Sequence, residues 1–362
     1  MKVQQAVTAQ EAKPALGAVI FAGLTTYAML AKRRRREHLR KASVGQARDA
    51  RGRTAKSPGE IPRRGWWDIV MRTKDDVSRN NLSLIAAGAA FYGFLAIPSA
   101  ITALVSLYGL MFDPRGVQRQ VEAMRGLLPD EAIRLISEQL QTLASHSNST
   151  LGAGLVMSLA LALWSARSGI SSMITALNIV YGEAEKRGYV RLQLVALGLT
   201  VGAVLSVLVA LALIAVLPAV LNLAPLGGVG KTIAALIRWP ILIALVIVAL
   251  AAIYRLAPSR EEPKWRWVSW GAVTATVLWI VASALFSIYV GRFATYDKSY
   301  GSLGAVVVLL MWLYLSAFVV LFGAQLNAEI EHQTARDSTT GSWRPLGRRG
   351  ALMADTVGPQ AK

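Results

Sequence analysis

The sequence predicts an all-α protein: a polytopic membrane helical bundle with six core transmembrane helices, an N-terminal anchor helix and amphipathic interfacial helices. Three observations predict this fold class. The 362 residues are 54% hydrophobic and only 17% charged, which is unusually apolar for a soluble domain. Apolar runs such as 192–221 and 299–328 contain no charge and exceed the ~20 residues that cross a bilayer. These runs are apolar on every side, unlike the short alternating strands of a barrel.

The first apolar segment, residues 14–31, is followed at once by the run KRRRRE. A secretory signal carries its positive charge before the apolar run, so we expect an anchor helix with its N-terminus outside. A cleaved signal or a helix lying flat at the interface are the alternatives. The six core segments are approximately 82–112, 151–181, 192–222, 232–256, 268–291 and 302–328.

The polar parts of the chain divide it into four regions. Residues 1–36 form the anchor helix and its basic flank, and 64–330 form the membrane core. Residues 37–63 are basic and almost without large apolar side chains, so they predict a disordered linker. The polar residues 331–362 predict a disordered cytoplasmic tail.

Amphipathic helices are expected at both membrane faces. Before the core, Trp66, Trp67 and Val70 share one helical face, and Asp68 and Arg72 lie opposite. This pattern is typical of a helix in the headgroup plane. The long loop 113–150 carries two further apolar faces and predicts two short amphipathic helices.

The basic residues predict the orientation. If residues 32–80 lie inside and the segments alternate, 28 of the 39 Lys and Arg residues fall in inside stretches. Cytoplasmic loops carry this excess, so we expect a multi-pass membrane protein with both ends of the core cytoplasmic. The net charge of +18 then needs no bound nucleic acid to explain it.

One arginine interrupts an apolar segment. Arg167, Ser171 and Asn178 share one face of the predicted helix over 151–181, and Tyr92 and Asn327 are polar groups on other core segments. An arginine at mid-bilayer costs from ~2.5 to ~17 kcal/mol, so this face is expected to point into the bundle. We name these five as candidate substrate-binding residues. The alternatives are a structural ion pair of Arg167 or a side chain that snorkels from a shallower position, and capping or interhelical bonding by the asparagines.

Other functional motifs are absent or incomplete. The chain has no cysteine, and its three histidines are far apart, so no metal site or hydrolytic triad is predicted. GGVGKT at 227–232 lacks the first glycine of a phosphate-binding loop, where Pro225 stands. We therefore predict no cofactor, no metal and no enzymatic activity.

Four stretches of the sequence together carry a family resemblance. They are NNLSLIAAGAAFYGFLAIPSAI, LWSARSGISSMITALNIVYGEAEKRGYVRL, APSREEPKWRWVSWGAVTATVLW and YDKSYGSLGAVVVLLMWLYLSAFVVLFGAQLNAEIE. They resemble the YihY/virulence factor BrkB family of bacterial inner-membrane proteins, formerly called ribonuclease BN-like. The resemblance covers roughly 64–335 and implies six core helices in a bacterial inner membrane, with no catalytic residues to carry over. The preceding helix and basic linker depart from it, and nothing in the sequence supports RNA cleavage, which needs a metal or an acid–base pair.

The polar face around Arg167 favours a carrier that moves a lipid or another amphiphile across or within the membrane. The alternative is a scaffolding membrane protein that organises envelope partners. Membrane lipids are the expected partners in either case. A homo-oligomer and envelope protein partners are left open.

Overall fold

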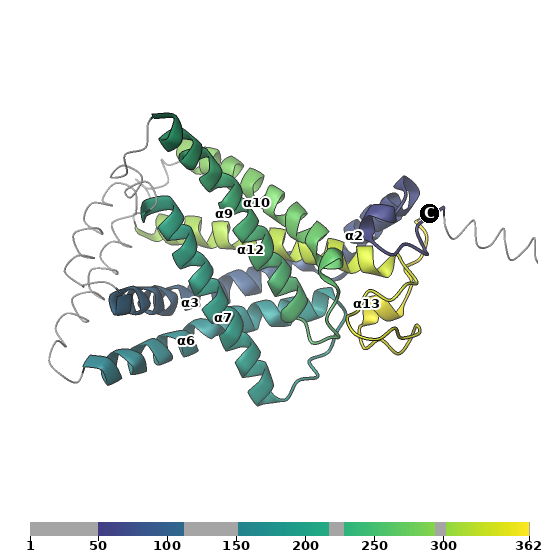
Figure 1. Cartoon of the computed structure of the whole chain (residues 1–362), viewed down its shortest axis with the longest axis horizontal. Helices are drawn as coiled ribbons and strands as arrows, with labels where there is room; N and C mark the ends of the chain where they lie inside the picture. The colour runs from purple at the N-terminus through teal and green to yellow at the C-terminus, as the bar shows by residue number, and fades with distance from the viewer. Residues whose placement is uncertain (1–49, 112–150, 217–227, 294–301, 362) are drawn as a thin grey trace, which may run out of the picture.

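The protein is described from a computed structural model, which covers residues 50–111, 151–216, 228–293 and 302–361. The described part of the chain is helical, apart from loops and one isolated bridge between Pro263 and Thr339. Figure 1 shows long helices running side by side, with the first and last described segments meeting at one end. The helices are α2 (Arg63–Arg79), α3 (Leu82–Met111), α6 (Leu151–Val180), α7 (Tyr189–Leu211), α9 (Gly228–Leu256), α10 (Trp265–Phe293), α12 (Ser302–His332) and α13 (Leu352–Asp355), with short turns η1 (Pro58–Glu60) and η2 (Ala212–Val216).

Six long helices form a closed ring. The order of contacts around it is α3, α6, α7, α9, α10, α12 and back to α3. The interface of α3 with α6 is the most extensive, and that of α7 with α9 is the least extensive of these neighbouring pairs. The seam between α7 and α9 is therefore the loosest part of the ring.

Small side chains allow the helices to approach closely. A Cβ added to Gly271 on α10 would lie 2.1 Å from the carbonyl oxygen of Gly323 on α12, so only glycine fits there. Such close contacts are typical of helix pairs in membranes, where burial from water does not drive association. The core around them is built from alanines and a few large side chains, among them Ile174, Leu177 and Leu321.

Among the described residues, five of the ring helices contain a stretch long and apolar enough to cross a membrane, and α6 contributes none. The prediction of six core spans is thus confirmed for five among the described residues. Arg167, Asn178 and several serines lower the hydropathy of α6, although the helix has 30 residues, as α3 does. Length and packing place α6 in the ring beside α3 and α7.

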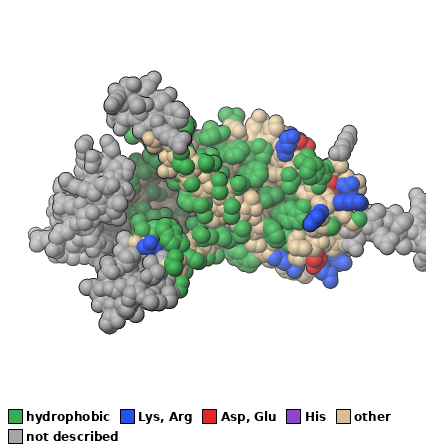
Figure 2. All heavy atoms as spheres, turned by 90° about the horizontal axis from the view of Figure 1, so that it is seen from above, with side chains coloured by type: hydrophobic (Ala, Val, Ile, Leu, Met, Phe, Trp, Pro, Cys, Tyr) green, Lys and Arg blue, Asp and Glu red, His purple; other side chains and the backbone are tan. Residues whose placement is uncertain are grey.

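Apolar side chains cover the outside of the bundle. Figure 2 shows hydrophobic side chains over its middle, whereas most visible Lys and Arg side chains gather at the right-hand end. Large exposed side chains such as Leu161, Val248 and Leu285 belong to this surface. In water this area would aggregate, so the surface fits a bundle surrounded by hydrocarbon.

The prediction of a disordered tail is wrong for residues 333–361, and that of a disordered linker is wrong for 50–62. These two segments fold together over one end of the bundle and are called the cap. The N–H of Ala335 donates to the carbonyl oxygen of Arg53 at 2.9 Å, and the hydroxyl of Thr334 donates to the carbonyl oxygen of Ala55 at 2.8 Å. Hydrogen bonds rather than apolar burial hold the cap, which is why its composition resembled that of a disordered segment.

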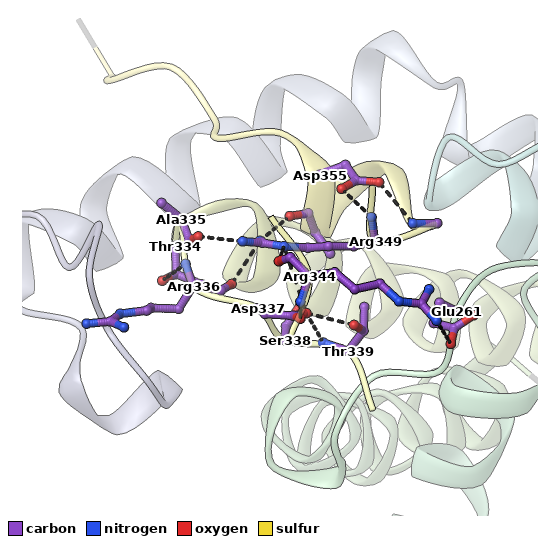
Figure 3. A network of polar contacts seen from close by, with 12 residues as sticks. Glu261, Thr334, Ala335, Arg336, Asp337, Ser338, Thr339, Arg344, Arg349 and Asp355 are labelled. Atoms are coloured by element: carbon purple, nitrogen blue, oxygen red, sulfur yellow. Dashed lines mark hydrogen bonds and ion pairs between the residues drawn. The ribbon is translucent and has the colours of Figure 1, made fainter. Parts of the chain in front are cut away.

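Arg349 lies at the centre of the cap with only 2% of its surface exposed. Its guanidinium donates to four carbonyl oxygens, and Asp337 lies 3.8 Å away (Figure 3). Hydrogen bonds to a charged group are the stronger kind, so one arginine ties several turns of the cap together. The four carbonyls belong to Ala335, Arg336, Arg344 and Ala354.

Helix α2 lies against the cap with its polar face inward. Trp67 and Val70 are 60% and 47% exposed, as expected of a face in the headgroup plane. Asp68 and Arg72, predicted to face water, are instead buried. Burial raises the pKa of Asp68, but hydrogen bonds from Arg51 and from a backbone N–H outweigh it and lower the pKa overall. The helix is therefore both an interfacial element and a protein contact.

Three predicted features lie outside the described residues. They are the anchor helix 14–31, the linker residues 37–49, and the two amphipathic helices in 113–150.

Candidate functional site

An open groove between α3 and α6, called here the Arg167 groove, is the candidate site. It has a volume of about 570 Å³. Tyr92 and the two polar residues Arg167 and Ser171 line it together, so the structure brings three of the five predicted site residues to one place. The other lining residues are Ile85, Gly88 and Ala89 of α3, and Ser168, Ser172, Thr175, Ala176 and Ile179 of α6.

Glycine and alanine give the groove its shape. Around Gly169 the two helices are close, because an added Cβ would meet the side chain of Ala96 at 3.2 Å and the Cα of Gly93 at 3.5 Å. At Gly88 an added Cβ would meet nothing within 4 Å. The helices thus touch at one level and leave open space at another, which the polar stripe of α6 faces.

Arg167 lies near the middle of α6, thirteen residues before its last residue. At about 1.5 Å per residue, this is roughly 20 Å from the end of a helix about 45 Å long, so a bilayer about 30 Å thick that is centred on the helix would hold Arg167 near its midplane. Its guanidinium carbon stands 4.1 Å from the ring centroid of Trp164. A cation over an indole face is stabilised by about 0.5–2 kcal/mol, far less than an arginine loses at that depth.

The charge of Arg167 has no carboxylate partner among the described side chains. Its Nε atom is buried without a hydrogen-bond acceptor. We expected the face of Arg167 to point into the bundle, but it lines an open groove, and the face of α6 that packs in the core includes Ile170, Ile174 and Leu177. The groove therefore holds a half-buried cation with unused donors.

Two of the five hydroxyl groups that line the groove donate hydrogen bonds within α6. Ser168 donates to the carbonyl of Ser165 at 3.0 Å, and Thr175 to that of Ser171 at 3.1 Å. A hydroxyl that donates to its own backbone still has lone pairs free to accept. The groove can therefore bind an anionic group at Arg167 and accept hydrogen bonds beside it, next to the apolar side chains of Ile85 and Ile179.

No group of three or more His, Asp or Glu side chains in the described ranges could hold a metal ion. The groove itself contains no carboxylate or imidazole among its lining residues. What it offers is a fixed cation, hydroxyls and apolar surface, which is a set suited to binding rather than to proton transfer.

Comparison with known proteins places the chain in a family. The family model described as Virulence factor BrkB matches residues 73–345, which is well over half of the chain. The chain belongs to the virulence factor BrkB family. This confirms the resemblance in the sequence, and with the five apolar helices it makes the chain a multi-pass membrane protein.

Relatives of this BrkB-family protein cover different shares of their own length. YfkH of Bacillus subtilis, named as ribonuclease-like, is 34% identical over 55% of this chain and 73% of its own. A UPF0761 membrane protein of Rhodospirillum centenum is 27% identical over 85% of this chain and 66% of its own. One from Idiomarina loihiensis is 37% identical over 26% of this chain and 33% of its own. No solved structure matches.

Asn178, the fourth predicted site residue, does not line the Arg167 groove of this BrkB-family protein. It is buried at the end of α6, where its amide donates to Glu185 at 3.0 Å and accepts from the N–H of Ser259 at 2.7 Å. A hydrogen bond from Arg187 is the main cause that lowers the pKa of Glu185 to about 2. Asn178 thus joins two loops and has no free group to offer a ligand.

Asn327, the fifth, joins two helices. Its side chain accepts from the N–H of Gly271 at 2.7 Å and donates to the carbonyl of Val268 at 3.0 Å. The bare backbone at Gly271 is what lets the amide reach in. The interhelical alternative left open in the sequence is the one that the geometry supports.

Sequence reasoning missed the buried ion pairs beside the cap. Arg72 contacts Glu329 at 2.5 Å, and Arg260 contacts Glu331 at 2.5 Å, with the latter pair 1% and 2% exposed. Two carboxylates at the end of a long apolar helix were the available signal, because buried charges need partners. Which arginines supply them depends on tertiary contacts across 257 and 71 residues.

Proposed function

We propose that the protein carries an amphiphile with an anionic headgroup, such as a lipid, across or within the membrane. One observation carries the proposal: Arg167 holds a positive charge deep in the bundle, in an open groove, with no carboxylate beside it among the described side chains. An arginine at this depth needs a counter-charge or water. A headgroup that moves through the groove would supply that charge transiently.

The walls of the groove suit such a ligand. Tyr92 is 51% exposed and Ile85 and Ile179 add apolar surface, so the acyl part of a lipid can follow the polar headgroup without leaving an apolar environment. Arginine presents several donors in one plane and recognises phosphate through two bonds at once. The proposal assigns binding and movement to the groove and no covalent chemistry.

The expected orientation places the capped end in the cytoplasm of a bacterial inner membrane, because Lys and Arg gather at that end. The chain has no cysteine, so single cysteines can be introduced without background. A cysteine at exposed Arg348 is expected to react with a membrane-impermeant maleimide only after the inner membrane is opened. Labelling of intact spheroplasts at that position would reverse the orientation.

The transport test uses the purified full chain in liposomes that contain fluorescent lipids of several headgroup classes. The wild type should move an anionic lipid faster than empty liposomes do, and Arg167→Ala should lose most of that gain. Arg266→Ala is the matched control, because Arg266 is exposed on α10 and lines neither this groove nor the one between α7 and α9. If no lipid class moves faster with protein than without it, the carrier proposal fails and a scaffolding role becomes the better account.

A further inference from the structure

A second groove lies at the loose seam between α7 and α9. It has a volume of about 760 Å³ and is called here the α7–α9 groove. No residue lines both this groove and the Arg167 groove. It runs from the loops beside the cap, where Gly350 contributes to its rim, into the apolar middle of the two helices.

The part within the helices is an apolar trough with a bare floor. Gly198 and Gly202 line it, and an added Cβ at either would meet nothing within 4 Å. Alanines rather than larger residues continue the floor on both helices, which leaves space that no side chain of the described residues fills. One hydroxyl lines the trough, that of Ser206, and it donates to the carbonyl of Gly202 at 2.8 Å. The trough is otherwise walled by Val195, Leu199, Ala203, Leu245, Val248, Ala249, Ala252 and Ile253.

The length of the trough matches one leaflet of a bilayer. On α9 its lining extends from Leu245 to Leu256, which are eleven residues apart. At about 1.5 Å per residue this is roughly 17 Å. Half of a hydrocarbon core about 30 Å thick is ~15 Å, so one acyl chain would fill the trough with its headgroup at the mouth.

The mouth is basic. Five Lys and Arg side chains and two Glu side chains line the groove there. Most of these cations are already paired: Arg187 contacts Glu185 at 2.7 Å, and Arg255 contacts Glu262 at 2.8 Å. Arg260 pairs with Glu331, and Lys186 with Glu183.

Arg191 is the exception among these five cations. It stands on the first turn of α7, is exposed, and has no carboxylate partner among the described side chains. Lys186, although paired, is 57% exposed at its side chain and can turn to a second anion. The mouth therefore presents a free guanidinium and an exposed ammonium at the level where a phosphate would sit.

We propose that the α7–α9 groove binds one anionic phospholipid of the leaflet that faces the cap, with an acyl chain in the trough and the phosphate at Arg191. The charge of the mouth favours an anionic headgroup over a zwitterionic one, because a zwitterion brings its own cation toward the arginine. The length and apolar walls favour a lipid over a soluble anion. The site would hold this lipid whether or not the protein transports anything.

The test measures lipid dissociation constants by native mass spectrometry on the detergent-purified full chain. The probes are phosphatidylglycerol, phosphatidylcholine and soluble glycerol phosphate. The wild type should bind phosphatidylglycerol at least about tenfold more tightly than phosphatidylcholine, and glycerol phosphate no more than weakly. Arg191→Ala should remove most of the preference for phosphatidylglycerol, and Gly202→Leu should weaken both phospholipids by filling the trough. Arg266→Ala is the control that should keep the wild-type dissociation constants, because Arg266 is exposed and lines neither groove.

Each outcome decides the proposal. Equal binding of the two phospholipids by the wild type would overturn the headgroup assignment, and strong binding of glycerol phosphate would overturn the lipid assignment. Unchanged binding in Gly202→Leu would overturn the trough. If Gly202→Leu lowers the unfolding temperature, Gly198→Leu one turn away repeats the test. If the α7–α9 groove binds lipid as expected but the protein moves no lipid, only the carrier proposal fails.

Discussion

The arginines at the capped end and the arginine in the groove between α3 and α6 meet very different surroundings. The side chains of Arg260 and Arg349 are almost fully buried, the first paired with a carboxylate and the second bonded to several carbonyl oxygens. Arg167 is only partly buried, and an indole ring is its principal neighbour. The protein thus supplies a carboxylate or hydrogen-bond acceptors to the arginines at the capped end, but not to Arg167.

Arg260 and Arg349 therefore stabilise the fold, whereas Arg167 is not required for it. Removing one partner of a buried ion pair leaves a bare charge and is costly. Removing Arg167 leaves no orphaned carboxylate among the described residues and relieves the cost of a cation at depth. Substitutions of the arginines at the capped end should therefore lower the stability of the protein more than substitution of Arg167 does.

Breaking the pair between Arg260 and Glu331 should have the largest effect. Arg260→Leu should lower the free energy of unfolding by about 3–5 kcal/mol, because Glu331 would stay buried without its partner. The guanidinium also lies 4.0 Å from the ring of Tyr181. The measurement is the mole fraction of sodium dodecyl sulfate at half-unfolding. Replacing both Arg260 and Glu331 with leucine should recover most of the loss, and a double variant as unstable as the single one would contradict the explanation.

Arg349→Met should release the cap while leaving the ring folded. Four carbonyl oxygens would lose their donor, at about 1–3 kcal/mol for buried polar groups left unsatisfied. Limited proteolysis should then cut residues 336–350 faster, by at least tenfold. The neighbouring Arg348 is exposed, so Arg348→Met should leave the cutting rate unchanged. Equal rates in both variants would show that Arg349 does not hold the cap.

Arg167→Leu should leave stability unchanged or raise it, because loss of the contact with Trp164, about 0.5–2 kcal/mol, is offset by removal of a cation from the apolar part of the bundle. Unfolding in lipid-free detergent is the measurement, compared directly with Arg260→Leu. A loss as large as that of Arg260→Leu would mean that Arg167 is a structural residue after all.

Asp76 should give the smallest effect, and one that depends on pH. Burial, followed by the neighbouring Glu329, raises its pKa to about 6. A raised folded-state pKa means that the folded protein holds the proton more tightly, so the stability from this group falls as pH rises from about 4 through about 6. Asp76→Asn should therefore stabilise the protein at pH 8, by less than about 1 kcal/mol for a partly exposed group, and not at pH 4. Exposed Asp75→Asn is the control, and an equal gain at both pH values would contradict the assignment.

The sequence was a good guide where the bilayer dictates the structure. Charge-free runs longer than a span became ring helices, because backbone groups in hydrocarbon must be bonded within the helix. The stripe of Arg167 and Ser171 on α6 also followed from helical spacing, and Tyr92 reached it from α3.

Composition misled where hydrogen bonds replace apolar burial. The cap reads as disordered because its buried groups include Arg349, Gln333 and Thr334 rather than large apolar residues. Asn178 and Asn327 looked like ligand-binding groups, but each bonds a backbone N–H brought close by a loop or a glycine. Such partners lie far away in the chain, so no local pattern reveals them.

The most direct test of the account is the headgroup selectivity of transport in Arg167→Gln compared with wild type. The quantity is the ratio of initial rates for an anionic and a zwitterionic lipid, each corrected for the amount of folded protein in the liposomes. The account predicts a ratio above one for the wild type that falls to about one in the variant, since the glutamine keeps polarity but not charge. An unchanged ratio in a fully folded variant would contradict the claim that the charge of Arg167 is kept for a ligand.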